Sequence, residues 1–331
     1  MVSTNSTTTV DLNESRAGKI TPVIIFCPAL ALVIVALRLY SRFVLGKRRF
    51  SEDYFIVLAM IFSIGVSLGL GIAVLFYGLG RHVQAVPPKA LTKYIKVGTS
   101  GRLFYQLTQM FMKVSISLQY LRISVMRFEK QLCYVLICFV VSQGIAYFVL
   151  AFTLCTPFKA IWNRHMPGAK CVHITAAYYV GICVTIAMDF AILLLPVFIL
   201  RHLTLRWYQK LVIAIVLAFG GLACIFSVLR FTSVRASTKA TDITWDQIYT
   251  AIYGTIEINT GIICSSIVTL KPLFQRHFPF LVRWLDAVGD RHVSMASWRS
   301  NVGPDLTTPP SNTIESKQYP KSVMAGDVII T

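Results

Sequence analysis

The chain has 331 residues, of which 55% are hydrophobic and only 14% are charged, whereas roughly 25% charged residues are usual in soluble domains. This composition excludes an ordinary soluble enzyme and predicts a protein that crosses a membrane several times. The formal net charge of +18 does not indicate a nucleic-acid partner, because Lys and Arg are confined to short segments between apolar runs, where they set topology and contact lipid head groups.

Seven apolar runs predict an all-α membrane protein, built as a bundle of seven transmembrane helices. At about 1.5 Å of rise per residue, each run is long enough to cross most or all of the roughly 30 Å hydrocarbon core of a bilayer. The expected spans are residues 20–40, 54–77, 103–121, 132–154, 176–200, 209–231 and 247–269, which together form a membrane domain of residues 20–270.

The segment before the first span, residues 1–19, is rich in Ser, Thr and Asn and contains glycosylation sequons at Asn5 and Asn13. The loop after this span is basic, with Arg42 and three further basic residues at 47–49, and the positive-inside rule places it in the cytoplasm. We therefore expect an extracellular, glycosylated N-terminus. Because seven spans put the two termini on opposite sides, the C-terminus should be cytoplasmic.

Three further segments are too polar to cross the bilayer. Residues 78–96, between the second and third spans, contain a Pro-Pro pair and four Lys or Arg residues, so we expect a loop outside the bilayer. In residues 271–293 apolar side chains recur at helical spacing, which predicts a short helix along the inner leaflet. Residues 294–331 are rich in Ser, Thr and Pro and should form a disordered cytoplasmic tail.

Six of the eight cysteines lie in or at the edge of the expected spans, where Cys behaves as a small apolar side chain. Cys155 and Cys171 share the loop between spans four and five, where an oxidising outer compartment would let them form a disulfide. Together with His165 and His173 they also resemble a metal site, but this set lacks a paired Cys-x-x-Cys core, so we expect no metal here.

Three ionisable residues, Lys113, Asp189 and Glu257, fall near the middle of spans three, five and seven. Each alone would cost ~2.5–3.5 kcal/mol at the bilayer centre on insertion scales, so they should face the interior and find partners. One interpretation is structural: an ion pair between Lys113 and Asp189, with Glu257 bonded to Ser, Thr or Asn259. The other is a ligand pocket or a proton-handling site built from the same residues.

The seventh expected span contains no lysine, so it cannot hold retinal through the Schiff base that light-driven proteins and sensory opsins need. Motifs of zinc proteases, nucleophile elbows and phosphate-binding loops are absent from the sequence as well. We therefore expect no cofactor, and the sequence establishes no catalytic residue.

Short patterns between residues 37 and 272 point to a family. They are Arg38-Leu-Tyr-Ser-Arg42 with Glu52-Asp53, Gly78-Leu-Gly-Arg-His82, Lys113-Val-Ser-Ile-Ser with Tyr120-Leu-Arg-Ile, Cys155-Thr-Pro with Trp162 and Cys171, Asp189 with Leu193-Leu-Leu-Pro196, Lys210, Phe219-Gly220, Arg230, Asp242-Ile-Thr-Trp245, Glu257 and Gly261. Together they resemble the fungal rhodopsin-domain integral membrane proteins, which include receptor-like members and proteins encoded in secondary-metabolite clusters. The chain departs from the family pattern at Lys271-Pro272, where Arg-Pro is usual, and at Tyr253, where a Trp is frequent.

The resemblance implies seven helices and an outward N-terminus, and it marks Lys113, Asp189, Arg230 and Glu257 as part of the shared pattern. With His82, these residues are our candidates for ligand binding. Asp189 and Glu257 are also the candidates for any catalytic role.

We expect a receptor-like sensor, in which an apolar or amphiphilic ligand enters the outer half of the bundle and shifts helices whose inner loops contact a cytoplasmic signalling partner. The alternative is a membrane-embedded enzyme or accessory protein of a secondary-metabolite pathway, in which Glu257 or Asp189 donates a proton to a lipophilic intermediate. A transporter fits less well, because the seven spans show no repeat. The protein should reside in the lipid bilayer of the plasma membrane or an endomembrane.

Overall fold

The computed structural model describes residues 15–45, 50–162, 167, 170–171, 174–200, 207–239 and 242–270, which all belong to the first of the chain's two units, Met1–Asp286. The α-helices are α1 (Ala17–Tyr40), α2 (Ser51–Tyr77), α3 (Pro88–Ile123), α4 (Arg127–Thr153), α5 (Ile174–Leu200), α6 (Trp207–Lys239) and α7 (Ile243–Ile267). The shorter elements are a π-helical turn (Ser41–Leu45), the 3-10 turns Val83–Ala85, Phe158–Ile161 and Val268–Leu270, and the strands β1 (Cys155–Thr156) and β2 (Lys170–Cys171).

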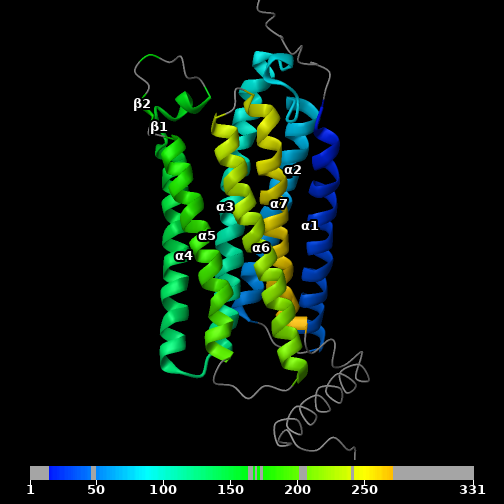
Figure 1. Cartoon of the computed structure of the whole chain (residues 1–331), viewed down its shortest axis with the longest axis vertical. Helices are drawn as coiled ribbons and strands as arrows, with labels where there is room; N and C mark the ends of the chain where they lie inside the picture. Colours follow the sequence, from blue (N-terminus) through cyan, green and yellow to red (C-terminus); the bar gives the residue numbers. More distant parts are fainter. Residues whose placement is uncertain are drawn as a thin grey trace, which may run out of the picture. The chain divides into compact units, whose positions relative to one another are not determined.

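The helices of the first unit run side by side and alternate in direction along the chain (Figure 1). α2 packs along α3, α6 packs along α7, and α7 also contacts α1, α2 and α3, so these five helices surround one interior. α4 packs on α3 and α5 packs on α6, which places this pair at one side of the bundle.

Five of the described helices are long and apolar enough to cross a membrane, in the segments Ala17–Val44, Ser51–Tyr77, Arg127–Thr153, Tyr179–Ile199 and Ala214–Thr238. Large apolar side chains point outward from them, with exposed fractions of 66% for Phe26, 78% for Leu75 and 64% for Val135. Such an apolar surface would favour aggregation in water and is typical of contact with lipid. The prediction of an all-α, multi-pass integral membrane protein is therefore confirmed.

α3 and α7 are not among these five helices, because polar residues interrupt both of them. In α7, every residue from 257 to 266 is buried, so its polar side chains contact protein rather than lipid. A helix enclosed in this way by its neighbours does not need an apolar outer surface. The expected count of seven spans stays a prediction.

The third helix begins earlier than the sequence predicted. α3 starts at Pro88 rather than at residue 103, so much of the expected loop is helical. Proline is favoured in the first helical turn, because its missing N–H group would have no partner there in any case. With 36 residues at about 1.5 Å each, α3 is roughly 54 Å long, and its polar first turns can extend beyond a bilayer of about 30 Å.

Two glycines with positive φ shape the connection between α2 and α3. Gly78 (φ 73°) ends α2 in the left-handed conformation that commonly terminates helices, and Gly80 has a φ of 91°. The N–H group of Gly80 donates to the carbonyl oxygen of Thr244 at 3.1 Å, and its carbonyl accepts from Arg16 N–H at 3.0 Å. The segment after α2 is thereby held between the first turns of α1 and α7.

A disulfide joins the end of α4 to the start of α5. β1 and β2 pair antiparallel with Cys155 opposite Cys171, and the two side chains are bonded. This hairpin lies at the same end of the bundle as the α2–α3 connection (Figure 1).

Several predictions concern residues outside the described part of the chain. These are the glycosylation sites Asn5 and Asn13, the helix of residues 271–293, the tail of residues 294–331, and the His165 and His173 of the alternative metal set. Within the ranges that the structure does describe, no group of three or more His, Cys, Asp or Glu side chains could hold a metal ion.

Candidate functional site

The side chains of Lys113 and Asp189 meet inside the bundle. Lys113 Nζ of α3 lies 2.9 Å from Asp189 Oδ1 of α5. Ser227 of α6 donates a hydrogen bond of 2.9 Å to the other carboxylate oxygen, and Lys113 also donates to the carbonyl oxygen of Thr185. Three helices therefore share this ion pair, and each charge has the partner that a low-dielectric interior requires.

Glu257 of α7 has a different set of partners. Its Oε1 atom accepts hydrogen bonds from Tyr105 Oη at 2.8 Å and from Gln109 Nε2 at 2.5 Å, both on α3. Its Oε2 atom lies 3.3 Å from Arg230 Nε of α6. The Glu257 carboxylate thus links α7 to both α3 and α6.

The structural interpretation is right about the Lys113–Asp189 ion pair but wrong about Glu257, whose described partners are not Ser, Thr or Asn259. Asn259 Nδ2 donates instead to the carbonyl oxygen of Thr255, and Asn259 Oδ1 accepts from Ser63 Oγ at 3.1 Å. Residues two positions apart on a helix do not face each other, so Glu257 and Asn259 meet different neighbours.

Lys113, Asp189 and Glu257 form two ion-pair groups rather than one cluster. Gln109 and Lys113 are about one turn apart on α3, and Ser227 and Arg230 are about one turn apart on α6, so the groups occupy adjacent turns. We call the Lys113–Asp189–Ser227 contacts the lower group and the Glu257 contacts with Tyr105, Gln109 and Arg230 the upper group. Together they cross-link α3, α5, α6 and α7.

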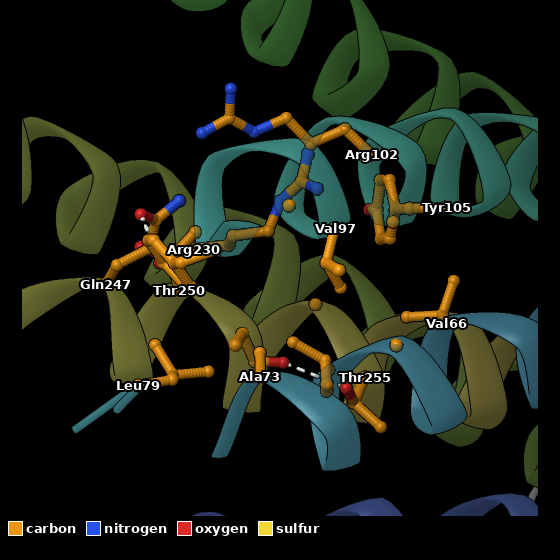
Figure 2. Close-up of a pocket in the computed structure, with 17 residues that line it drawn as sticks. Val66, Ala73, Leu79, Val97, Arg102, Tyr105, Arg230, Gln247, Thr250 and Thr255 are labelled. Carbon is orange, nitrogen blue, oxygen red and sulfur yellow. Dashed lines mark hydrogen bonds between the residues drawn. The ribbon is translucent and has the colours of Figure 1, made fainter. Parts of the chain in front are cut away.

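A cavity of about 150 Å³ lies beside Arg230, between α2, α3, α6 and α7 (Figure 2). Most of its wall is aliphatic, with polar groups contributed by Arg102, Tyr105, Arg230 and Gln247 among others. The Arg230 side chain reaches from α6 toward α3, where its Cζ atom lies 4.4 Å from the centre of the Tyr105 ring. Tyr105 and Arg230 therefore belong both to the cavity wall and to the upper group.

Glycines create part of this space. Gly69, Gly98, Gly101 and Gly254 all line the cavity. A Cβ atom added at Gly98 or Gly101 would meet no heavy atom within 4 Å. A side chain could therefore be added at either of these cavity-lining positions without first displacing a neighbour.

His82 lies apart from the other candidate ligand-binding residues. Its Nδ1 atom is 3.0 Å from Asp242 Oδ2, and its ring stacks on Trp245 with 4.1 Å between ring centres. The Arg16 guanidinium also lies 4.1 Å from the centre of the Trp245 ring. His82 is not among the residues that line the cavity, and its contacts fasten the α2–α3 connection to the start of α7.

A second set of charged side chains, of which Arg38, Glu52 and Asp53 are buried, occupies the opposite end of the bundle. Arg38 of α1 donates to Asp53 Oδ1 of α2 at 2.9 Å and to the carbonyl oxygen of Ser265 on α7 at 3.0 Å. Glu52 Oε1 of α2 lies 2.8 Å from Arg122 Nη1 of α3. These contacts join the ends of α1, α2, α3 and α7.

Tyr105, Gln109 and the cavity were missed by sequence analysis, because it considered only ionisable residues at mid-depth. The spacing of polar residues in α3 could nevertheless have indicated Tyr105 and Gln109. Tyr105, Gln109 and Lys113 are spaced four residues apart, which places all three on one face of α3. A polar stripe of this length on a membrane helix indicates a face that contacts other polar groups.

The sequence model of the fungal rhodopsin domain matches residues 37–276, a region that contains both ion-pair groups and the cavity. Similar proteins include a SAT4 family membrane protein of Emericella nidulans, 30% identical over 61% of this chain and 51% of the relative. The polyenoic acids biosynthesis gene cluster protein Ba17b of Metarhizium anisopliae is 24% identical over 77% of this chain and 72% of its own length.

A third relative, Receptor GIN3 of Arthrobotrys oligospora, is 23% identical over 55% of this chain and 44% of the relative. The matched region thus spans about half the length of the SAT4 family relative and less than half of GIN3. No solved structure matches the chain.

Proposed function

The chain belongs to the fungal rhodopsin domain family, and from this premise we propose that it is a receptor-like sensor of a small apolar or amphiphilic ligand that binds in the cavity beside Arg230. In this proposal all seven helices cross the membrane, with the N-terminus outside and the C-terminus in the cytoplasm. The ligand is not retinal, because α7 contains no lysine for a Schiff base.

One observation carries the proposal. Arg230 both lines the cavity and lies 3.3 Å from the buried Glu257 carboxylate of the neighbouring helix. A ligand can shift a conformational equilibrium only by as much as its affinity for the two arrangements differs. A molecule that contacts Arg230 would change the attraction between α6 and α7, and so would bind one arrangement of these helices better than the other.

The contacts at the opposite end of the bundle offer a route for the response. The cavity is lined in part by α2, α3 and α7. At the opposite end, the Arg38–Asp53 and Glu52–Arg122 ion pairs connect α1, α2 and α3, and the hydrogen bond from Arg38 to Ser265 connects α1 to α7. A shift of α3 or α7 would therefore rearrange charged side chains at that end. A cytoplasmic signalling partner would recognise the rearranged surface there.

A second candidate function is supported by a relative. Ba17b, whose name assigns it to a polyenoic acids biosynthesis gene cluster, aligns with 77% of this chain. By analogy, this chain would act as an enzyme or accessory protein on a lipophilic pathway intermediate, with Glu257 or Asp189 as proton donor. Glu257 already holds three protein partners, so a catalytic role would require one of them to move away.

The two functions can be separated in a strain that lacks the gene. Wild type, Gly101→Leu and Gly221→Leu are reintroduced, and both transcription and metabolites are measured. Gly221 is the matched control, because it lies in α6 outside the cavity lining and a Cβ there also meets nothing within 4 Å. A sensor predicts that Gly101→Leu alone fails to restore the transcriptional response while pathway intermediates are unchanged.

The enzyme alternative makes the opposite prediction. Purified protein would convert a pathway intermediate, and Glu257→Gln would stop the conversion without unfolding the protein. That result would overturn the sensor proposal.

A further inference from the structure

We propose that the cavity takes an amphiphilic carboxylate, whose acidic group binds Arg230 in competition with Glu257 and whose apolar part lies between α2 and α7. This inference rests on the proposed ligand-sensing function and adds the chemical class of the ligand. It follows from the hydrogen bonds that Arg230 lacks, from the charges of the cavity wall and from the size of the cavity.

The described contacts of Arg230 supply fewer hydrogen-bond acceptors than a guanidinium with five N–H groups can use. Its Nε atom and Glu257 Oε2 are 3.3 Å apart, yet both are buried without a hydrogen-bond partner. Its other described contact, with the Tyr105 ring, supplies no oxygen or nitrogen acceptor. Because buried polar groups are normally hydrogen-bonded, we infer that a ligand supplies an acceptor for the Arg230 N–H groups.

A carboxylate matches this need. It can accept two parallel hydrogen bonds from one guanidinium, in a geometry that gives both strength and orientation. The Gln247 side chain, whose Oε1 atom accepts from Tyr94 Oη at 2.8 Å, adds an amide NH₂ donor to the same cavity. Alcohols and amides would satisfy fewer of these donors.

The charges of the cavity wall favour an anion over a cation. Among the described residues that line the cavity, Arg102 and Arg230 are cationic and none is acidic. Glu257 is not part of the lining, and its Oε1 atom is already bonded to Tyr105 and Gln109. An amine in this cavity would meet two guanidinium groups and no carboxylate.

The rest of the wall selects an apolar body of limited size. Val66, Leu70, Ala73 and Ala251 contribute aliphatic surface, and the glycines widen the space. A cavity of about 150 Å³ with apolar walls is large enough for benzene. The part of the ligand that is buried should therefore be a short alkyl chain or one aromatic ring.

Binding of a carboxylate would also account for a response. Glu257 is held by α3 through Oε1, so Arg230 can leave Oε2 while Glu257 stays in place. Transfer of Arg230 to the ligand would remove the attraction between α6 and α7 at this level. The competition predicts that loss of the Glu257 charge strengthens ligand binding, whereas loss of the Arg230 charge weakens it.

The test uses the full chain in lipid nanodiscs and isothermal titration calorimetry at neutral pH. The probes are octanoate, octanol and octylamine, which share one chain and differ in charge, together with phenylacetate. Octanoate represents an acid that enters from the bilayer, and phenylacetate one that enters from water. We expect at least one of the two acids to bind. If octanoate binds, its affinity should be at least tenfold higher than that of octanol or octylamine.

The variants give a matched set. Arg230→Gln should weaken binding of the acid at least tenfold, Glu257→Gln should strengthen it severalfold, and Arg235→Gln should leave it unchanged, since Arg235 is exposed on α6 outside the cavity. If Arg230→Gln does not fold, the comparison of wild type with Glu257→Gln and the comparison of octanoate with octanol still decide the question.

Equal affinity for octanoate and octanol, no binding of either acid, or an unchanged affinity in Glu257→Gln would overturn the carboxylate proposal. The ligand-sensing proposal fails separately. If octanol and octanoate bind equally and Gly101→Leu abolishes both, the cavity remains a ligand site without acid preference. If Gly101→Leu retains the response to stimulus in cells, the sensing proposal falls as well.

Discussion

Lys113 Nζ and Asp189 Oδ1 lie 2.9 Å apart, and this ion pair joins α3 to α5 in the interior of the bundle. α5 otherwise packs mainly on α6 and contacts α3 over a shorter stretch. The pair therefore contributes one of the specific links between the α4–α5 side of the bundle and the five helices α1, α2, α3, α6 and α7. Its removal can be used to measure how much this link stabilises the fold.

Asp189→Ala should destabilise the protein by about 3 kcal/mol, because Lys113 would stay buried without its counter-charge. At roughly 2–4 °C per kcal/mol, the thermal midpoint in detergent should fall by about 10 °C. The double variant Lys113→Met with Asp189→Leu removes both charges and should recover most of this loss. A double variant that is no more stable than Asp189→Ala would show that the charges themselves are not the cause.

The Lys113–Asp189 contact illustrates what the sequence could predict. Few charged residues fall at mid-depth of the apolar runs, and charges of opposite sign at similar depth must find partners there. The partners of Glu257 could not be predicted in the same way. Tyr105 and Gln109 are uncharged, and neutral polar side chains in these helices often bond to their own backbone, as Thr99 and Thr108 do.

The start of α3 shows another limit of prediction. Charge and proline in residues 78–96 indicate correctly that the segment is polar, but a polar segment can be helical or not, and only the contacts of the folded chain decide. The cavity could not be predicted from the sequence either. It depends on which way Gly98, Gly101 and Gly254 face, and that orientation follows from the packing of four helices rather than from local sequence.

Gly80→Ala should destabilise the protein by about 2 kcal/mol, because a side chain disfavours the left-handed φ of 91°. The added Cβ would also lie 2.8 Å from Ile248 Cδ1 and 3.2 Å from the backbone nitrogen of Ala17. Gly98→Ala is the control, since it lies inside α3 with open space around its Cβ and should be neutral or stabilising by about 0.5–1 kcal/mol. Equal thermal midpoints for the two variants would contradict this account of the α2–α3 connection.

Replacing both Cys155 and Cys171 with Ser should lower stability by about 3 kcal/mol, because their disulfide closes a loop with a sequence separation of 16 residues. Cys138→Ser, at an exposed position of α4, should leave the thermal midpoint unchanged. Peptide mapping without reductant should also recover the linked pair from wild type. If wild type and the double variant have the same thermal midpoint in the absence of reductant, the disulfide does not stabilise this end of the α4–α5 pair.

Glu52→Gln should loosen the end of the bundle opposite the disulfide. The Glu52 carboxylate lies 2.8 Å from Arg122 Nη1 and 3.7 Å from Arg42 Nη2, and both guanidinium groups also contact the Phe50 ring. Glutamine keeps the shape of the side chain but removes its charge, so the two cations would repel each other without compensation. The end of α3 around Arg122 would then open more often, whereas the distant first turns of α3 would be unaffected.

Hydrogen–deuterium exchange measured by mass spectrometry should therefore increase in peptides covering residues 116–126 and stay constant in peptides covering residues 88–98. A uniform increase along α3 would mean that Glu52 supports the whole helix, and no increase would mean that the other contacts at this end hold Arg122 in place. Because the proposed sensor transmits ligand binding to these same charges, an increase confined to residues 116–126 would support this end of α3 as the part that responds when the helices shift.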